Sequence, residues 1–298
     1  MSATHVSPGA RLRTLLAQDE PVVCPGAMNA LFARLIGRAG FSSVYMTGAG
    51  VANGLLGQPD VGLTTLTEMA QMAQNISTAV DLPVFADADT GFGGSVNVER
   101  TVQLYERAGV AAIQLEDQMV PKRCGHFEGK EVVTVDEMRA RLRAALAARN
   151  DPDLMIVART DARSVHGIDE AIGRGAAYAE AGADALFIEA PADDDELARV
   201  GAELAATGLP LVANMVEGGK TPLHSAGELF ELGFKLVIFP GLLSRITVRA
   251  VTDALAVLAE GGDSRPLLDQ LTQFSEMQSY LELDELNARV AGYEEVNR

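Results

Sequence analysis

Residues 83–117 read PVFADADTGFGGSVNVERTVQLYERAGVAAIQLED. The run 83–87 is almost continuously apolar up to its last residue, which is typical of a strand buried on both faces in a parallel sheet. In 99–109 apolar residues recur at helical spacing, and the closing glycine is the residue that most often ends a helix. A second apolar run, 112–117, follows at once. This stretch therefore predicts a strand, a helix and a second strand parallel to the first.

The same alternation of apolar run and helical segment recurs along the chain. Eight repeats in roughly 240 residues predict an α/β fold of the closed (β/α)8 type, the TIM barrel, which needs about 250 residues. An open doubly wound sheet is the alternative. The predicted strands are 22–25, 43–47, 83–87, 112–117, 155–159, 185–189, 211–214 and 236–240.

We divide the chain into a barrel domain, 1–260, and a C-terminal helical extension, 261–298. Apolar residues in the extension recur at helical offsets, so it needs a surface to cover. Two interpretations are open at this point. The extension packs on its own barrel, or it is offered to another subunit.

Composition limits the partners. The chain has 298 residues, of which 48% are hydrophobic, so a large core is feasible. Its 41 acidic and 24 basic residues give a net charge of −17, which disfavours nucleic acid and anionic membranes. Two cysteines are too few for a disulfide scaffold, and the N-terminus lacks the apolar run of a signal peptide. We expect a cytoplasmic protein that acts on a small molecule.

Acidic residues follow four successive predicted strands, from the third to the sixth. Catalytic groups of a TIM barrel lie at these strand ends, and clustered carboxylates repel one another unless a cation is present. Asp87 and Asp89 point to the same side of an extended chain, so both can reach one ion. With Asp60 and Glu116 in support, we predict a Mg2+ site. The alternative is that 89–91 is only a turn with an acidic cap.

Two further features suit an anionic substrate. Thr47, Gly48 and Ala49 follow the second predicted strand, where backbone N–H groups can bind an anion, although such turns are more often plain connectors. Arg159 ends an otherwise apolar run, and a buried guanidinium demands an anionic partner such as a carboxylate. A salt bridge to a neighbouring strand-end acid is the alternative for Arg159.

The segment Lys122-Arg123-Cys124-Gly125-His126 surrounds a thiol with two cations and an imidazole. Such neighbours lower the pKa of a thiol, which favours a catalytic role for Cys124. Zinc ligation by Cys124 and His126 is the alternative, but no second Cys/His pair completes a zinc site. Cys24, inside the first predicted strand, is expected to be an inert core residue.

These motifs closely resemble the isocitrate lyase and phosphoenolpyruvate mutase superfamily, and within it the short methylisocitrate lyase type. The resemblance covers nearly the whole chain. It is carried by YMTGAG at 45–50, GQPD at 57–60, DADTGFG at 87–93, EDQ at 116–118, KRCGH at 122–126, ARTDA at 158–162 and NMVEGGKTP at 214–222.

The resemblance implies Mg2+, with Mn2+ as a substitute, held by Asp87, while Asp60, Asp89 and Glu116 assist through water. It also implies that a carboxylate of the substrate is held by Arg159 and by the segment after the second strand. The implied substrate contacts are Thr47, Gly48, Ala49, Gly125, Arg159, Glu189, Asn214 and Thr221.

The implied reaction is C–C cleavage by an oxo-acid-lyase. Tyr45 is the candidate base for the substrate hydroxyl, and Cys124 is the general acid for the enolate-like carboxylate that leaves, tuned by Lys122 and His126. Loss of the hydroxyl proton expels a carbanion, which survives only where metal and cations neutralise its charge. Substrates of this kind are 2-hydroxy di- or tricarboxylates, such as 2-methylisocitrate or 2,3-dimethylmalate.

Several alternatives stay open. They are a phosphonomutase acting on a carboxyphosphonoenolpyruvate-like substrate, an oxaloacetate hydrolase or decarboxylase, and a non-catalytic barrel that binds dicarboxylates. Departures from the methylisocitrate lyase pattern at 217–220 and 240–244 make a dicarboxylate as well supported as a tricarboxylate. The resemblance further implies that the last helices are exchanged between neighbours in a dimer of dimers, a homotetramer.

Overall fold

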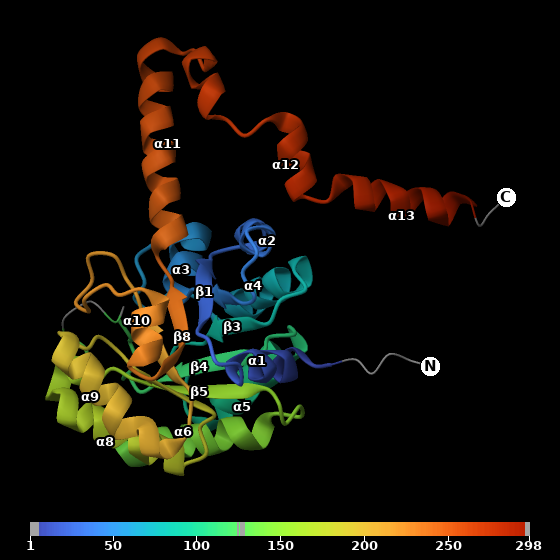
Figure 1. Ribbon diagram of the computed structural model, residues 1–298. Helices are drawn as coiled ribbons and strands as arrows, with labels where there is room; N and C mark the ends of the chain where they lie inside the picture. The colour runs from blue at the N-terminus through green and yellow to red at the C-terminus, as the bar shows by residue number, and fades with distance from the viewer. Residues whose placement is uncertain (1–5, 124, 126–128, 296–298) are drawn as a thin grey trace. The chain divides into compact units, whose positions relative to one another are not determined.

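The computed structural model describes residues 6–123, 125 and 129–295. Within these residues eight parallel strands pair in chain order and the eighth pairs with the first, so the sheet closes into a barrel (Figure 1). The TIM barrel predicted from the sequence is confirmed. The strands are β1 (Val22–Ala27), β2 (Val44–Met46), β3 (Val84–Asp87), β4 (Ala112–Glu116), β5 (Met155–Thr160), β6 (Ala185–Ile188), β7 (Leu211–Asn214) and β8 (Phe234–Phe239).

Helices connect the strands on the outside of the barrel (Figure 1). Many begin at a residue whose side chain accepts a hydrogen bond from a free backbone N–H of the first turn, as Thr65 and Ser225 do. The helices of this unit are α1 (Pro8–Leu16), α2 (Ala30–Arg38), α3 (Gly48–Leu56), α4 (Leu66–Ala79), α5 (Ser95–Arg107), α6 (Val135–Ala148), α7 (Arg163–His166), α8 (Ile168–Glu180), α9 (Asp194–Leu204), η1 (Ala205–Thr207) and α10 (Ala226–Glu231).

Two apolar cores result from the alternation of side chains along each strand. Val44 and Met46 pack with residues of the surrounding helices. Tyr45, between them, packs in a second cluster made only of strand residues and of residues from α1, together with Ala111 just before β4. This second cluster is the barrel interior, and α1 covers its N-terminal end. Cys24 belongs to it and is fully buried, which raises the pKa of its thiol to about 12 and confirms the predicted core position.

The chain divides into two units between Leu243 and Ser244, near the start of α11 (Leu242–Gly261). The sequence-based division lies later, at 260/261. The second unit continues with η2 (Arg265–Gln270), α12 (Phe274–Tyr280) and α13 (Leu283–Glu295). No residue of α11 is buried, and five of its large apolar side chains are exposed, namely Ile246, Val248, Val251, Leu255 and Leu258. Exchange of these helices between subunits stays a prediction.

None of the described helices combines the length and the hydropathy that a membrane-spanning segment requires.

Candidate active site

The predicted acidic residues meet at the C-terminal mouth of the barrel, because parallel strands end at the same edge. Asp87 and Glu116 are the last residues of β3 and β4, and Glu189 directly follows β6. Adjacent strands bring Glu116 level with Arg159 in β5. All four side chains are buried, each with a relative exposure of 7% or less.

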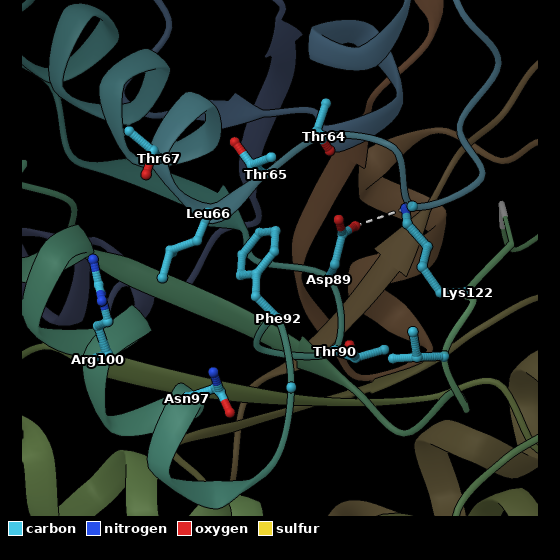
Figure 2. Close-up of a pocket in the computed structure, with 13 residues that line it drawn as sticks. Thr64, Thr65, Leu66, Thr67, Asp89, Thr90, Phe92, Asn97, Arg100 and Lys122 are labelled. Atoms are coloured by element: carbon cyan, nitrogen blue, oxygen red, sulfur yellow. Dashed lines mark ion pairs between the residues drawn. The ribbon is translucent and has the colours of Figure 1, made fainter.

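Lys122 lies among the predicted metal carboxylates. Its Nζ is 2.6 Å from Asp89 Oδ1 (Figure 2). It also pairs with Asp60 Oδ1, so the loop after β4 reaches two other segments. A cavity of about 460 Å3 borders this ion pair, between 62–67 and 89–93. Asp89 and Phe92 in its wall have φ angles of 49° and 59°, in the left-handed region that side chains rarely adopt. Strain of this kind concentrates at functional sites.

Burial and neighbouring negative charge disfavour the ionised form of these carboxylates. Burial raises the pKa of Asp89 from 3.8 to about 6, although the ammonium of Lys122 acts in the opposite direction. Burial also raises the pKa of Asp87 and, more strongly, that of Glu116, against the influence of Lys122 and Arg159. A divalent cation would stabilise the ionised form of these carboxylates.

The described residues offer an incomplete ligand set, which only a cation that keeps much of its water would fit. Among the described residues, no group of three or more His, Cys, Asp or Glu side chains converges as a ready-made ligand cage. Within the same residues, the buried Glu116 Oε1 has no hydrogen-bond partner. One direct carboxylate with others acting through water, the pattern typical of Mg2+, is consistent with this arrangement.

Arg159 is surrounded by three carboxylates. Its Nε lies 2.9 Å from Asp161 Oδ2 and 3.4 Å from Glu116 Oε2, and its NH2 group lies 3.7 Å from Glu189 Oε2. The salt bridge to a neighbouring strand-end acid, considered as an alternative from the sequence, is therefore present at Glu116 and Glu189, and Asp161 on the same strand adds a closer one. Asn214, at the end of β7, donates to Glu189 Oε2 at 3.1 Å and joins it to this group.

The small residues after β2 form the first turn of α3. Thr47 caps this helix by accepting a hydrogen bond from Gly50 N, so Gly48 and Ala49 are at the helix N-terminus. A Cβ added to Gly48 would lie 2.6 Å from Asp87 Oδ2. The structure thus places backbone N–H groups and a helix dipole beside the predicted metal ligand, where an anion is favoured.

Tyr45 reaches the site through a residue that the sequence analysis missed. The Tyr45 hydroxyl donates to Gln114 Oε1 at 3.3 Å, and Gln114 Nε2 donates to Asp87 Oδ1 at 3.2 Å. Burial, together with the charge of Asp87, raises the pKa of Tyr45 well above 10. Gln114 is a polar residue inside an apolar run, and this pattern is a sequence signal for a buried residue that contacts the site.

Part of the KRCGH segment is described. Gly125 lies so close to the site that an added Cβ would be 2.4 Å from Glu189 Oε1 and 2.5 Å from an Arg159 nitrogen. Cys124 and His126 lie outside the described residues. Thr221 is buried and belongs to the chain segment that joins β7 to α10. The roles assigned to these residues from the sequence stay predictions.

Comparison with known proteins establishes the family. Residues 12–259 match the family model described as phosphoenolpyruvate phosphomutase. The chain belongs to the phosphoenolpyruvate mutase/isocitrate lyase superfamily, a group of C–C lyases and related enzymes.

The chain is similar along nearly its whole length to two lyases and to a phosphonopyruvate hydrolase. The chain is 48% identical to 2,3-dimethylmalate lyase of Eubacterium barkeri, over 93% of this chain and 95% of that protein. It is 42% identical to 2-methylisocitrate lyase of Aeropyrum pernix, over 95% and 91%. A solved structure of phosphonopyruvate hydrolase in complex with oxalate and Mg2+ is 30% identical, covers 96% of this chain and 99% of its own, and superposes with a TM-score of 0.85.

Proposed function

We propose that this chain is a Mg2+-dependent C–C lyase that cleaves a 2-hydroxy di- or tricarboxylate into a 2-oxo acid and a second carboxylic acid. The observation that carries the proposal is the pairing of a buried guanidinium, Arg159, with a carboxylate cluster at the mouth of the barrel. Similarity to 2,3-dimethylmalate lyase favours an alkylmalate as the substrate, with 2-methylisocitrate next.

Asp87 would hold the metal directly, while Asp60, Asp89 and Glu116 would act through water, and Mn2+ would substitute for Mg2+. The unpaired oxygen of Glu116 and the raised pKa values of the carboxylates support this assignment. When bound, the cation supplies positive charge that stabilises a developing enolate.

The substrate is proposed to bind through its carboxylates. Arg159 and the N-terminus of α3, at Thr47, Gly48 and Ala49, would hold the carboxylate next to the hydroxyl carbon, because both present N–H donors to an anion. The rest of the pocket would be lined by Gly125, Glu189, Asn214 and Thr221.

Two protein groups are proposed to move protons. Tyr45 would accept the hydroxyl proton only as the phenolate, so its own proton must leave first; burial raises its pKa in the protein alone, and a cation beside Asp87 would act in the opposite direction. The bond between the hydroxyl carbon and its neighbour then breaks, which leaves a 2-oxo acid and a carbanion. Cys124 would donate the proton that quenches the carbanion, with Lys122 and His126 raising the thiol's acidity.

We further propose that the chain is a homo-oligomer, in which a second copy covers the exposed apolar residues of α11. Val251 and Leu255 are 49% and 58% exposed, and burying such side chains favours association. A dimer of dimers is the arrangement that the resemblance implies.

A substrate panel tests the reaction. We would measure 2-oxo acid release from 2,3-dimethylmalate, 2-methylisocitrate, isocitrate, citramalate and oxaloacetate with Mg2+ or with EDTA. We expect metal-dependent release from an alkylmalate or 2-methylisocitrate, lowered at least about a hundredfold in Cys124→Ser. Cys24→Ser, at a thiol buried far inside the barrel, should be active.

The panel also separates the alternatives. The family model that matches is named for a phosphomutase, so phosphonopyruvate is included. Its conversion, without cleavage of any carboxylate, would replace the lyase proposal by the phosphonomutase. Release from oxaloacetate alone would favour the hydrolase or decarboxylase. Oxalate binding without any turnover would favour the non-catalytic barrel.

A further inference from the structure

Lys130 contacts two parts of the site at once. Its ammonium donates to Asp161 Oδ1 at 2.7 Å and to the backbone carbonyl of Gly125. The side chains of Lys130 and Asp161 are 1% and 0% exposed. A buried ammonium has few ways to make its hydrogen bonds, so these two acceptors fix its position.

Asp161 in turn binds Arg159. Its two oxygens accept from Arg159 Nε at 2.9 Å and from Arg159 NH2 at 3.2 Å, a two-point contact that sets the plane of the guanidinium. Its backbone N–H donates to the buried Asp117 at 2.9 Å, which anchors Asp161 from the other side. The carboxylate therefore has little freedom between its two cationic partners.

Lys130 also balances the charge around Arg159. Glu116 and Glu189 both approach the guanidinium, so Asp161 would add a third full negative charge beside it. The ammonium of Lys130 offsets that charge, which leaves more of the positive field of Arg159 available to an anionic ligand.

We propose that Lys130 is a positioning residue, which acts through Asp161 to orient Arg159 toward a ligand carboxylate and through the Gly125 carbonyl to hold that segment against Arg159 and Glu189. The inference rests on the proposed function in one respect, that Arg159 binds a carboxylate. It does not depend on which carboxylic acid is cleaved.

The test measures oxalate affinity rather than turnover. Isothermal titration calorimetry with oxalate and Mg2+ would compare the wild type with Lys130→Met and Lys130→Arg, with thermal unfolding recorded for each. We expect Lys130→Met to bind oxalate roughly tenfold more weakly or worse, since a charged hydrogen bond is lost. Lys130→Arg should recover much of the affinity, because a guanidinium can also bridge a carboxylate and a carbonyl.

Lys235→Met is the matched control. Lys235 also donates to a backbone carbonyl, that of Gln18 at 2.9 Å, but it lies near the opposite end of β8 from the site. Its loss should leave oxalate affinity unchanged. A purely structural Lys130 would give a lower unfolding temperature with wild-type oxalate affinity, and that result would overturn the proposal.

A double variant covers the case in which Lys130→Met does not fold. Lys130→Met/Asp161→Asn removes both charges, so no uncompensated carboxylate stays buried. We expect it to fold and to bind oxalate weakly, whereas wild-type affinity would overturn the proposal. If the wild type binds oxalate and cleaves nothing, only the proposed reaction fails. If the wild type does not bind oxalate, the carboxylate role of Arg159 fails, and the inference with it.

Discussion

The carboxylate of Asp161 is fully buried and yet ionised. Burial alone would raise its pKa, but the charges of Arg159 and Lys130, and the hydrogen bonds from both, outweigh burial and hold the pKa well below 3.8. A group whose pKa is lower in the folded state adds stability above its unfolded pKa. That stability is lost as the pH falls toward the folded pKa.

Asp161→Asn should therefore destabilise the protein in a pH-dependent way. At pH 7 we expect a loss of about 3–5 kcal/mol in the free energy of unfolding, because the buried Lys130 loses its carboxylate and Arg159 loses the nearest of its three. The difference from wild type should narrow as the pH falls below 3.8, the ordinary pKa of the carboxyl. Urea unfolding at several pH values measures it. Asp169→Asn, at an exposed pair with Arg199, should cost little. A loss at Asp161 that does not vary with pH would contradict this assignment.

Gly125→Ala tests the close approach of the loop backbone to the site. An added Cβ would meet Glu189 and Arg159 at 2.4 and 2.5 Å, so these groups or the loop must move. A shift of about 1 Å near the chemistry can cost roughly a hundredfold in rate, and we expect a loss of that order in kcat/KM with the fold retained. Gly173→Ala, where no atom lies within 4 Å, should keep full activity. Full activity of Gly125→Ala would show that the segment does not lie against the site during turnover.

The sequence predicted the charged residues of the site more readily than the residues that hold them in position. Asp87, Glu116 and Arg159 could be recognised because each directly ends an apolar run, and strand ends converge in a barrel. Lys130 could not be recognised, since its contacts with Gly125 and Asp161 exist only after the loop has folded back. Gln114 was overlooked, although a polar residue in a buried run was a visible signal.

At the scale of elements, the contact of α9 with the turn before β8 depends on a single glycine. A Cβ at Gly201 would lie 1.8 Å from the carbonyl oxygen of Leu232, so only glycine allows the helix to pack this closely. We expect Gly201→Ala to lower the free energy of unfolding by about 1–3 kcal/mol, as overpacking does elsewhere. Gly227→Ala in α10, with no atom within 4 Å, is the control. Chemical denaturation compares them, and equal stability would contradict the packing described.

The strands themselves could be predicted because each reads as a short apolar run with a turn signal after it, and all eight runs carry a strand. The start of α3 was less obvious. The glycines at 48 and 50 suggested a turn, yet Thr47 caps a helix there. The glycine at 48 serves packing instead, because an added Cβ would lie 2.6 Å from Asp87 Oδ2.

At the scale of the whole molecule, the proposed anionic ligand must bind to a chain whose net charge is −17. Arg159, Lys122 and Lys130 gather at the mouth of the barrel, and a divalent cation would add to them. The carboxylates of the site outnumber these three cations, so we expect binding of an anionic ligand to depend on the divalent cation.

The apolar stripe of α11 predicts an oligomer. At 100° per residue, Val248, Val251, Leu255 and Leu258 lie on one side of the helix, and all are more than 40% exposed. Leu255→Glu should shift the protein to a smaller species in size-exclusion chromatography with light scattering. Asp253→Lys, on the opposite side, should leave the mass unchanged. A wild type that is already monomeric would contradict the proposed oligomer.

Product analysis in deuterium oxide, with Mg2+ and 2,3-dimethylmalate as the first substrate, tests the proposed C–C cleavage most directly. Breaking the bond between its two substituted carbons would give pyruvate and propionate. We expect equal amounts of the two products by NMR, with one solvent deuterium on the propionate carbon that was in the broken bond. Consumption of substrate without a 2-oxo acid, or a second acid that carries no deuterium, would contradict it.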